Sequence, residues 1–246
     1  KNMASYILKS FIVEFFLLIG VLAILLYNAS ILSFSSWNFP LLDKESFNQS
    51  LFVLFICLLL SINNDITSFS ALHIFSNDVT SLSIKTLLLI AVIGSLICGK
   101  PYFLSKNINL FEYYTIVLLS VFSLLFLTSS TDLISIYLCL EMQSLCFYVL
   151  ASFNRYSVFS TEAGLKYFVL GAFSSCLFLL GASVLYGLTG TTNLANLALL
   201  LTGLDSSLIN VSFIYFGLIF ILVTIFFKLT AAPFHIWSPD VYEGSD

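Results

Sequence analysis

The sequence predicts an all-α, polytopic membrane helix bundle of about seven transmembrane helices. The first supporting observation is composition: 59% of the residues are hydrophobic and only 9% are charged, whereas soluble domains carry roughly 25% charged residues. The second is a series of apolar runs long enough to cross a bilayer. The third is that ionisable side chains stand deep inside two of these runs, the fifth and the seventh, and a proline interrupts the last one. Lipid is therefore the expected solvent of most of this chain.

Composition also excludes several classes of protein. A disordered chain would be polar and rich in charge, and a nucleic-acid binder would be basic, whereas this chain has a formal net charge of −4. The cysteines lie in apolar runs, no pair of them forms CxxC, and no dinucleotide or phosphate loop is present. We therefore expect no nucleic-acid partner, no metal and no cofactor in this chain.

A transmembrane helix needs about 20 mostly apolar residues. The expected spans lie near residues 10–27, 47–62, 84–99, 112–130, 132–153, 161–188 and 210–237. The third span is expected to stop at Pro101. The first is interpreted as a retained helix rather than a signal peptide, because Tyr27-Asn28-Ala29-Ser30 is a poor small-residue cleavage site.

Glu141 is an ionisable side chain deep inside the fifth span. It follows Asp132 at a distance of about 14 Å along a helix, and a charge near mid-bilayer costs roughly 2.5–3.5 kcal/mol, so such residues tend to be paired and functional. Tyr137, Glu141, Ser144 and Tyr148 recur at helical spacing and form one polar stripe. We expect this stripe to face other helices or internal water; the alternative is a carboxyl group that only hydrogen-bonds a neighbouring helix.

Lys228 is the second deep charge, and Pro233 follows it closely. Proline is expected to kink or break the span 210–237, and broken helices within a membrane free backbone groups that bind ions or water. Thr224, Lys228 and His235 are expected on one helical face. Lys228 either serves a function or snorkels to the interface, and His235 either titrates or hydrogen-bonds within a turn.

Three further charges are less deeply placed. Lys166 stands one turn after Glu162, a favourable i,i+4 arrangement. It is therefore either a shallow structural ion pair or an intermediate proton carrier. Glu14, early in the first span, is expected to be an interfacial or packing residue.

A buried Glu and a buried Lys together predict a proton or cation path. Burial favours the neutral form of each group, and an opposite charge nearby favours the charged form. A pair that separates and re-forms can therefore load and release a proton, which makes Glu141 and Lys228 the leading candidates.

Five stretches of the sequence carry a resemblance to a known family: Leu140–Tyr148, Phe159–Phe168, Leu170–Ser175, Tyr186–Gly190 and Phe227–Ser245. They resemble subunit 2 of NADH dehydrogenase (complex I), in particular its mitochondrial, N-terminal half. The wider family contains the antiporter-like subunits of complex I and of multisubunit sodium/proton antiporters. The similar stretches are dense from about residue 130 to residue 245 and faint before that.

The resemblance implies a fold of about fourteen helices with two inverted repeats, each containing a broken helix. Residues 1–110 would be three peripheral or contact helices, and residues 111–246 would be helices four to seven, an incomplete first repeat. The resemblance further implies that Glu141 pairs with Lys228 in a proton channel driven by quinone reduction elsewhere in the complex. The chain would then be a non-redox subunit of a proton-translocating NADH:ubiquinone reductase.

The chain departs from the family pattern because it stops at Asp246, after the seventh helix. We expect a split subunit, in which a second polypeptide supplies helices 8–14 and packs against 161–188 and 210–237; the alternative is a truncated chain. The other expected partners are the remaining membrane-arm subunits of complex I and lipids, and the expected location is the mitochondrial inner membrane. Two competing interpretations stay open: a subunit of a multisubunit cation/proton antiporter, and a structural membrane scaffold without transport.

Overall fold

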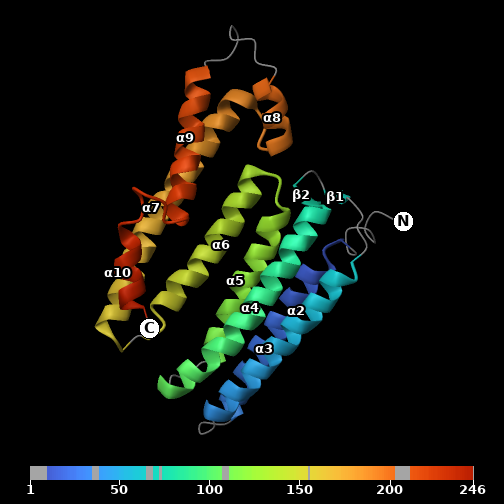
Figure 1. The fold of residues 1–246 in the computed structure, drawn as a ribbon, viewed down its shortest axis with the longest axis vertical. Helices are drawn as coiled ribbons and strands as arrows, with labels where there is room; N and C mark the ends of the chain where they lie inside the picture. The colour runs from blue at the N-terminus through green and yellow to red at the C-terminus, as the bar shows by residue number, and fades with distance from the viewer. Residues whose placement is uncertain are drawn as a thin grey trace. The chain divides into compact units, whose positions relative to one another are not determined.

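Helices account for nearly all of the regular structure in the computed structural model (Figure 1). The structure describes residues 10–34, 39–64, 69–71, 74–106, 111–154, 156–202 and 211–245. Within those residues, six helices are long and apolar enough to cross a membrane, and a shorter apolar helix covers Ser212–Lys228. The predicted all-α membrane bundle is confirmed. The chain divides into two units, Lys1–Ser129 and Ser130–Asp246, which are described separately.

The N-terminal unit is built from four long helices, which run side by side in Figure 1. Helix α2 packs on α3 and α5, and α4 packs on the same two helices. Its core is aliphatic, since Leu17, Leu54, Leu89 and Leu118 have no exposed surface. The elements are α2 (Ile12–Phe34), α3 (Phe39–Ile62), β1 (Phe69–Ala71), β2 (Phe75–Asn77), α4 (Val79–Lys106) and α5 (Phe111–Ser129).

Two features of this unit differ from the sequence prediction. Strands β1 and β2 pair antiparallel, with Ser70 opposite Ser76, in a segment that was expected to be a loop; strands this short carry too few residues for a recognisable alternation. Helix α4 was expected to stop at Pro101 but continues through it to Lys106. A proline this close to the C-terminus of a helix removes one backbone hydrogen bond, and the remaining bonds hold the last turn.

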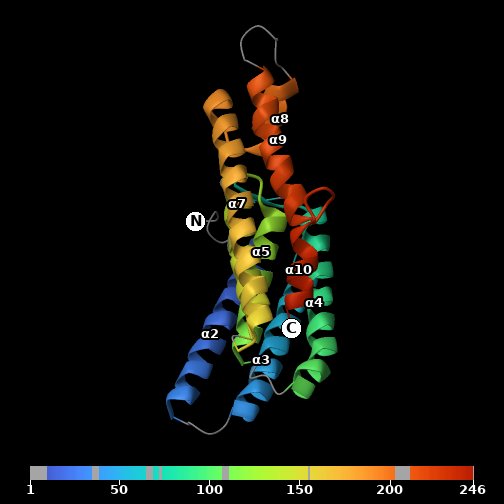
Figure 2. The ribbon, with the colours of Figure 1, turned by 90° about the vertical axis from the view of Figure 1, so that its left-hand side faces the viewer.

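The C-terminal unit is organised around its longest helix, α7. Helix α7 packs on α6, α9 and α10, and Figure 2 shows α9 and α10 lying along it. Its N-terminus is capped by Ser157, whose side chain accepts a hydrogen bond from the Ser160 amide. The elements are α6 (Leu133–Ala151), α7 (Val158–Thr189), α8 (Leu194–Thr202), α9 (Val211–Lys228) and α10 (Trp237–Gly244).

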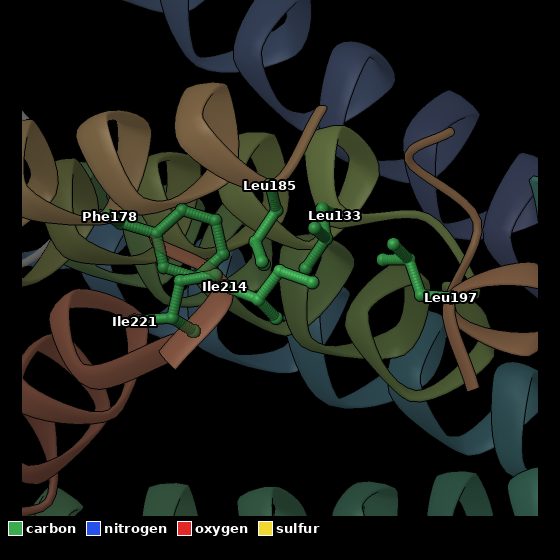
Figure 3. Close-up of a cluster of buried hydrophobic side chains, with 6 residues drawn as sticks. All are labelled: Leu133, Phe178, Leu185, Leu197, Ile214 and Ile221. Carbon is green, nitrogen blue, oxygen red and sulfur yellow. The ribbon is translucent and has the colours of Figure 1, made fainter. Parts of the chain in front are cut away.

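The core of this unit joins four helices, α6, α7, α8 and α9. Of these, α8 is a short helix that was not predicted from the sequence. The backbones of α6 and α8 are tied at their starts, because Leu194 donates to the Thr131 carbonyl at 3.0 Å. Figure 3 shows the buried side chains of this core, which are Leu133, Phe178, Leu185, Leu197, Ile214 and Ile221.

Small residues allow α7 to approach its neighbours closely. A Cβ atom on Gly171 would lie 1.9 Å from the Tyr148 hydroxyl oxygen, so the Tyr148 ring occupies the space that a side chain at position 171 would need. A Cβ atom on Gly181 would lie 2.6 Å from the Gly217 carbonyl oxygen, which brings α7 and α9 together. Close helix approach through small residues is a common packing mode in membranes.

The division into units differs from the domain division expected from the sequence. Helix α5 packs within the N-terminal unit, on α2, α3 and α4, and the boundary between the units in the sequence follows Ser129. The expected boundary at 110/111 concerns membership in a repeat rather than packing, and it stays a prediction.

Candidate ion-pair site in the C-terminal unit

Glu141 and Lys228, 87 residues apart in sequence (228 − 141), lie close together in the structure. Glu141 sits about midway along α6, and Lys228 is the last residue of α9. The Lys228 Nζ lies 3.8 Å from the Glu141 Oε1, and the two side chains are 21% and 24% exposed. The Lys228 Nζ also donates a hydrogen bond of 3.2 Å to the Leu140 carbonyl oxygen.

These distances describe a loose charge pair. A separation of 3.8 Å is longer than a hydrogen bond between charged groups, which is typically ~2.7–2.9 Å. The ammonium therefore keeps a direct bond to a neutral carbonyl while it attracts the carboxylate. Such an arrangement can change partners without leaving the ammonium unbonded.

The end of α9 places Lys228 at this position. The Thr230 amide donates to the Phe227 carbonyl at 3.2 Å and the Ala231 amide to the Phe226 carbonyl at 2.9 Å. These two bonds form a Schellman motif, whose C′ residue adopts a left-handed conformation. Thr230 occupies that position with φ 53°, and Pro233 follows before α10 begins. The break expected near Pro233 is confirmed, and Lys228 lies immediately before it.

The predicted polar stripe of α6 faces α7. The Tyr137 ring stacks on Phe178 with centroids 5.9 Å apart, and the Tyr148 ring meets Tyr167 edge-on at 4.7 Å. Ser144 is buried, and its hydroxyl donates to the Glu141 carbonyl at 3.0 Å. The stripe therefore points into the protein, with Glu141 in its middle.

Thr224 ties α9 to α7 one turn before Lys228. Its hydroxyl lies 3.0 Å from the Ser174 carbonyl oxygen of α7 and 2.9 Å from the Phe220 carbonyl oxygen of its own helix. Only 1% of Thr224 is exposed. This residue fixes the position of α9 and so of the lysine that follows.

Lys166 has two carboxylate partners. Its Nζ lies 2.9 Å from Glu162 Oε1, as the i,i+4 spacing predicted, and 3.0 Å from Asp240 Oδ2 on α10. The side chain is 45% exposed. The Asp240 contact was missed because it joins residues on either side of the helix break, and the sequence holds no spacing signal for it.

His235 does not continue the face formed by Thr224 and Lys228, and that expectation is wrong. The helix ends at Lys228, so the helical spacing no longer applies beyond it. His235 is exposed, and its carbonyl accepts hydrogen bonds from the amide and hydroxyl of Ser238 at 3.1 and 2.9 Å. Its backbone therefore helps to start α10.

The site consists of groups that can hold and exchange a proton. It offers one carboxylate, one ammonium and a backbone carbonyl. Among the described residues, no three His, Cys, Asp or Glu side chains gather as metal ligands would. The Leu140 carbonyl is a functional group that no side-chain pattern in the sequence could have indicated.

Comparisons with known proteins find a matching family model and several similar proteins. Residues 130–246 match the family described as NADH:quinone oxidoreductase/Mrp antiporter, TM. The chain is 40% identical over 238 residues to NADH-ubiquinone oxidoreductase chain 2 of Marchantia polymorpha, covering 94% of this chain and 48% of that protein. It is 46% identical over 171 residues to NADH-quinone oxidoreductase subunit N of Beijerinckia indica, covering 70% of this chain and 35% of that protein.

A solved structure shares the fold. One chain of respiratory complex I from Thermus thermophilus with bound aureothin superposes with a TM-score of 0.71 and 26% identity, over 95% of this chain and 47% of that chain. This chain therefore spans about half the length of the relatives that it matches.

Proposed function

We propose that this chain, whose residues 130–246 match the family described as NADH:quinone oxidoreductase/Mrp antiporter, TM, is a membrane-arm subunit of respiratory NADH:ubiquinone oxidoreductase. In this role it contributes a Glu/Lys half-channel for protons and no redox centre. The observation that carries the proposal is the 3.8 Å approach of the Lys228 ammonium to the Glu141 carboxylate beside a helix break.

The pair works as a switch in this proposal. While Glu141 is ionised, its charge holds Lys228 in the ammonium form. A proton that reaches Glu141 removes that attraction, and Lys228, now bonded only to the Leu140 carbonyl, releases its proton more readily because burial favours the neutral amine. Tyr137, Ser144 and Tyr148 line the α6 side of the path. Lys166, whose ammonium is held by Glu162 and Asp240, must first pass its own proton on, and it then accepts the next one as the following carrier toward α10.

The attraction within the ion pair is similar in size to the energy needed to move one proton across an energised membrane. Opposite unit charges about 4 Å apart attract by ~4 kcal/mol at the effective dielectric constant of partly buried sites. Moving one charge against 100 mV costs ~2.3 kcal/mol. Breaking and re-forming one such pair can therefore be matched to the movement of one proton across an energised membrane.

The chain is a multi-pass protein of the mitochondrial inner membrane, which its spanning helices and its likeness to NADH-ubiquinone oxidoreductase chain 2 support. Its partners in this proposal are the other membrane-arm subunits and the surrounding lipid. The expectation that a second polypeptide carries helices 8–14 stays a prediction.

The test is proton pumping by the assembled complex in reconstituted vesicles. Glu141→Gln and Lys228→Ala are each expected to lower NADH-driven pumping at least fivefold while the complex stays assembled, since each leaves one member of the pair without its partner. Glu243→Gln, which neutralises an exposed carboxylate of the same unit, is the matched control and should pump normally. Full pumping by assembled Glu141→Gln and Lys228→Ala complexes would favour the scaffold interpretation and contradict the proposal.

A further inference from the structure

A second pair of opposite charges lies in the N-terminal unit, outside the residues that match the family. The Lys85 Nζ of α4 lies 2.5 Å from the Glu14 Oε1 of α2, and both side chains are 1% exposed. The same ammonium donates to Asn77 Oδ1 at 2.6 Å, and Asn77 Nδ2 donates to the Ser10 carbonyl oxygen at 2.5 Å. The three side chains thus join the start of α2, the end of β2 and the first turns of α4.

Aromatic side chains cover this cluster. The Phe11 ring stacks on Phe126 at 6.2 Å and meets Phe75 edge-on at 5.9 Å. The Lys85 Nζ lies 5.7 Å from the centre of the Phe11 ring. Lys85 is therefore enclosed by the hairpin and by aromatic rings, and it does not extend to water as a snorkelling lysine would.

The charges depend on each other. Glu14 Oε2 is buried without a hydrogen-bond partner among the residues that the structure describes, so Lys85 supplies the compensation for this carboxylate. Removing one member of a buried pair leaves an uncompensated charge, which is strongly destabilising. Replacing both members by apolar residues of similar volume is often neutral or stabilising.

We propose that Glu14, Lys85 and Asn77 form a polar clamp that fixes α2 against α4 and fastens the β-hairpin onto this end of the N-terminal unit, and that this pair does not exchange protons during turnover. The contrast with the Glu141–Lys228 pair supports the second part. A proton carrier needs contact with a donor and an acceptor in turn, and a pair at 2.5 Å with 1% exposure is enclosed on all sides, whereas Glu141 and Lys228 are 3.8 Å apart and partly exposed.

The modification rate of the native Cys57 thiol can be used to measure whether the clamp is intact. Cys57 on α3 has no exposed surface, and its Sγ lies 3.9 Å from the carbonyl oxygen of Val13, the residue before Glu14. Loosening of α2 is therefore expected to open Cys57 to N-ethylmaleimide. The modification rate is read in the full assembled complex by mass spectrometry of the peptide that contains Cys57.

If the clamp exists, the single variants should loosen the N-terminal unit and the double variant should restore it. Glu14→Gln and Lys85→Met are each expected to raise the Cys57 modification rate at least tenfold and to reduce the amount of assembled chain. The double variant Glu14→Leu with Lys85→Met should restore the protection, the assembled amount and NADH-driven pumping. Glu112→Gln and Lys44→Met, which change exposed charges of the same unit, should leave the rate unchanged.

Three outcomes would overturn the proposal. Unchanged Cys57 protection in both single variants would show that no clamp exists. A double variant that accumulates no better than the single variants would contradict the argument that the two charges of the clamp only compensate each other. A double variant that assembles with Cys57 protected but no longer pumps, beside a pumping wild type, would show that the pair carries protons. The thiol readout needs no pumping, so a failure of the clamp is distinguishable from a failure of the proposed function.

Discussion

Lys85 and Lys228 both place an ammonium within an apolar helix unit, but they are compensated differently. Lys85 has a carboxylate at 2.5 Å and an amide oxygen at 2.6 Å. Lys228 has a backbone carbonyl at 3.2 Å and a carboxylate at 3.8 Å. A short, enclosed pair resists any change of charge state, whereas a longer and partly exposed pair permits it. Distance and exposure therefore separate the structural role proposed for Lys85 from the conducting role proposed for Lys228.

Thr230 is the residue that bears backbone strain at the helix break. It holds the left-handed C′ position with φ 53°, a conformation that costs a residue with a side chain roughly 1–2 kcal/mol and is rare for a β-branched one. Thr230→Gly is expected to stabilise the chain by about 1 kcal/mol, after allowance for the greater freedom of glycine in the unfolded chain. The measurement is the temperature at which the chain is lost from the detergent-solubilised complex.

The matched control for Thr230→Gly is a substitution that should change the thermal midpoint in the opposite direction. Thr128 lies within helix α5, where glycine is unfavourable, so Thr128→Gly should lower the same midpoint. A lower midpoint for Thr230→Gly as well would contradict the assignment of strain to Thr230.

At the scale of elements, the contact between α7 and α9 determines where Lys228 lies. Gly181 and Gly217 bring the two backbones together, and the Thr224 hydroxyl bonds across the contact to Ser174. A side chain at position 181 would meet the Gly217 carbonyl oxygen at 2.6 Å, and a backbone atom cannot rotate away as a side chain can. The helices would have to separate, and α9 would move relative to Glu141 on α6.

Gly181→Leu is accordingly expected to destabilise the chain by roughly 1–3 kcal/mol or more and to lower pumping by the complex that still assembles. Gly187→Leu on the same helix is the control, since a Cβ atom there would meet nothing within 4 Å. Thermal loss of the chain and NADH-driven pumping are measured for both variants. Equal effects of the two substitutions would show that close packing at Gly181 is unimportant.

Across the whole molecule, the sequence predicted features that depend on composition and local spacing. Apolar runs located the long helices, and Pro233 located the break. The hairpin of β1 and β2 and the short helix α8 were not predicted, because neither is long enough for a clear periodicity. Glu14 was expected to be an interfacial or packing residue, but its partner Lys85 could not be found, because 71 residues separate them.

The candidate site, too, could be predicted only where it depends on local spacing. Helical spacing predicted that Tyr137, Glu141, Ser144 and Tyr148 share one face of α6, and the rings of Tyr137 and Tyr148 contact α7. The pairing of Glu141 with Lys228 came from the resemblance to a family. The link between Lys166 and Asp240 joins α7 to α10, and it needed the three-dimensional course of the chain after the break.

The outer faces of the C-terminal unit bear on its assembly. Helices α7 and α9 carry large apolar side chains that are open in this chain, such as Phe173 at 63% and Ile219 at 55% exposure. In a membrane such faces are covered by lipid or by other helices, and association between helices depends on close packing. The partners that cover them also decide between the proposed function and a multisubunit cation/proton antiporter, because Glu141 and Lys228 would serve in either assembly.

We expect this chain, solubilised in a mild detergent, to migrate on native gels together with the NADH-oxidising and membrane-arm subunits of NADH:ubiquinone oxidoreductase, identified by mass spectrometry. A polypeptide similar to the remaining half of the chain 2 relatives should migrate with it and should cross-link to residues 161–188 or 210–237. Solubilisation in a denaturing detergent is the control and should separate all of them. Migration with cation/proton antiporter subunits and without any NADH-oxidising subunit would contradict the assignment to complex I. If only lipid covered the faces of α7 and α9, the prediction of a second polypeptide would be wrong.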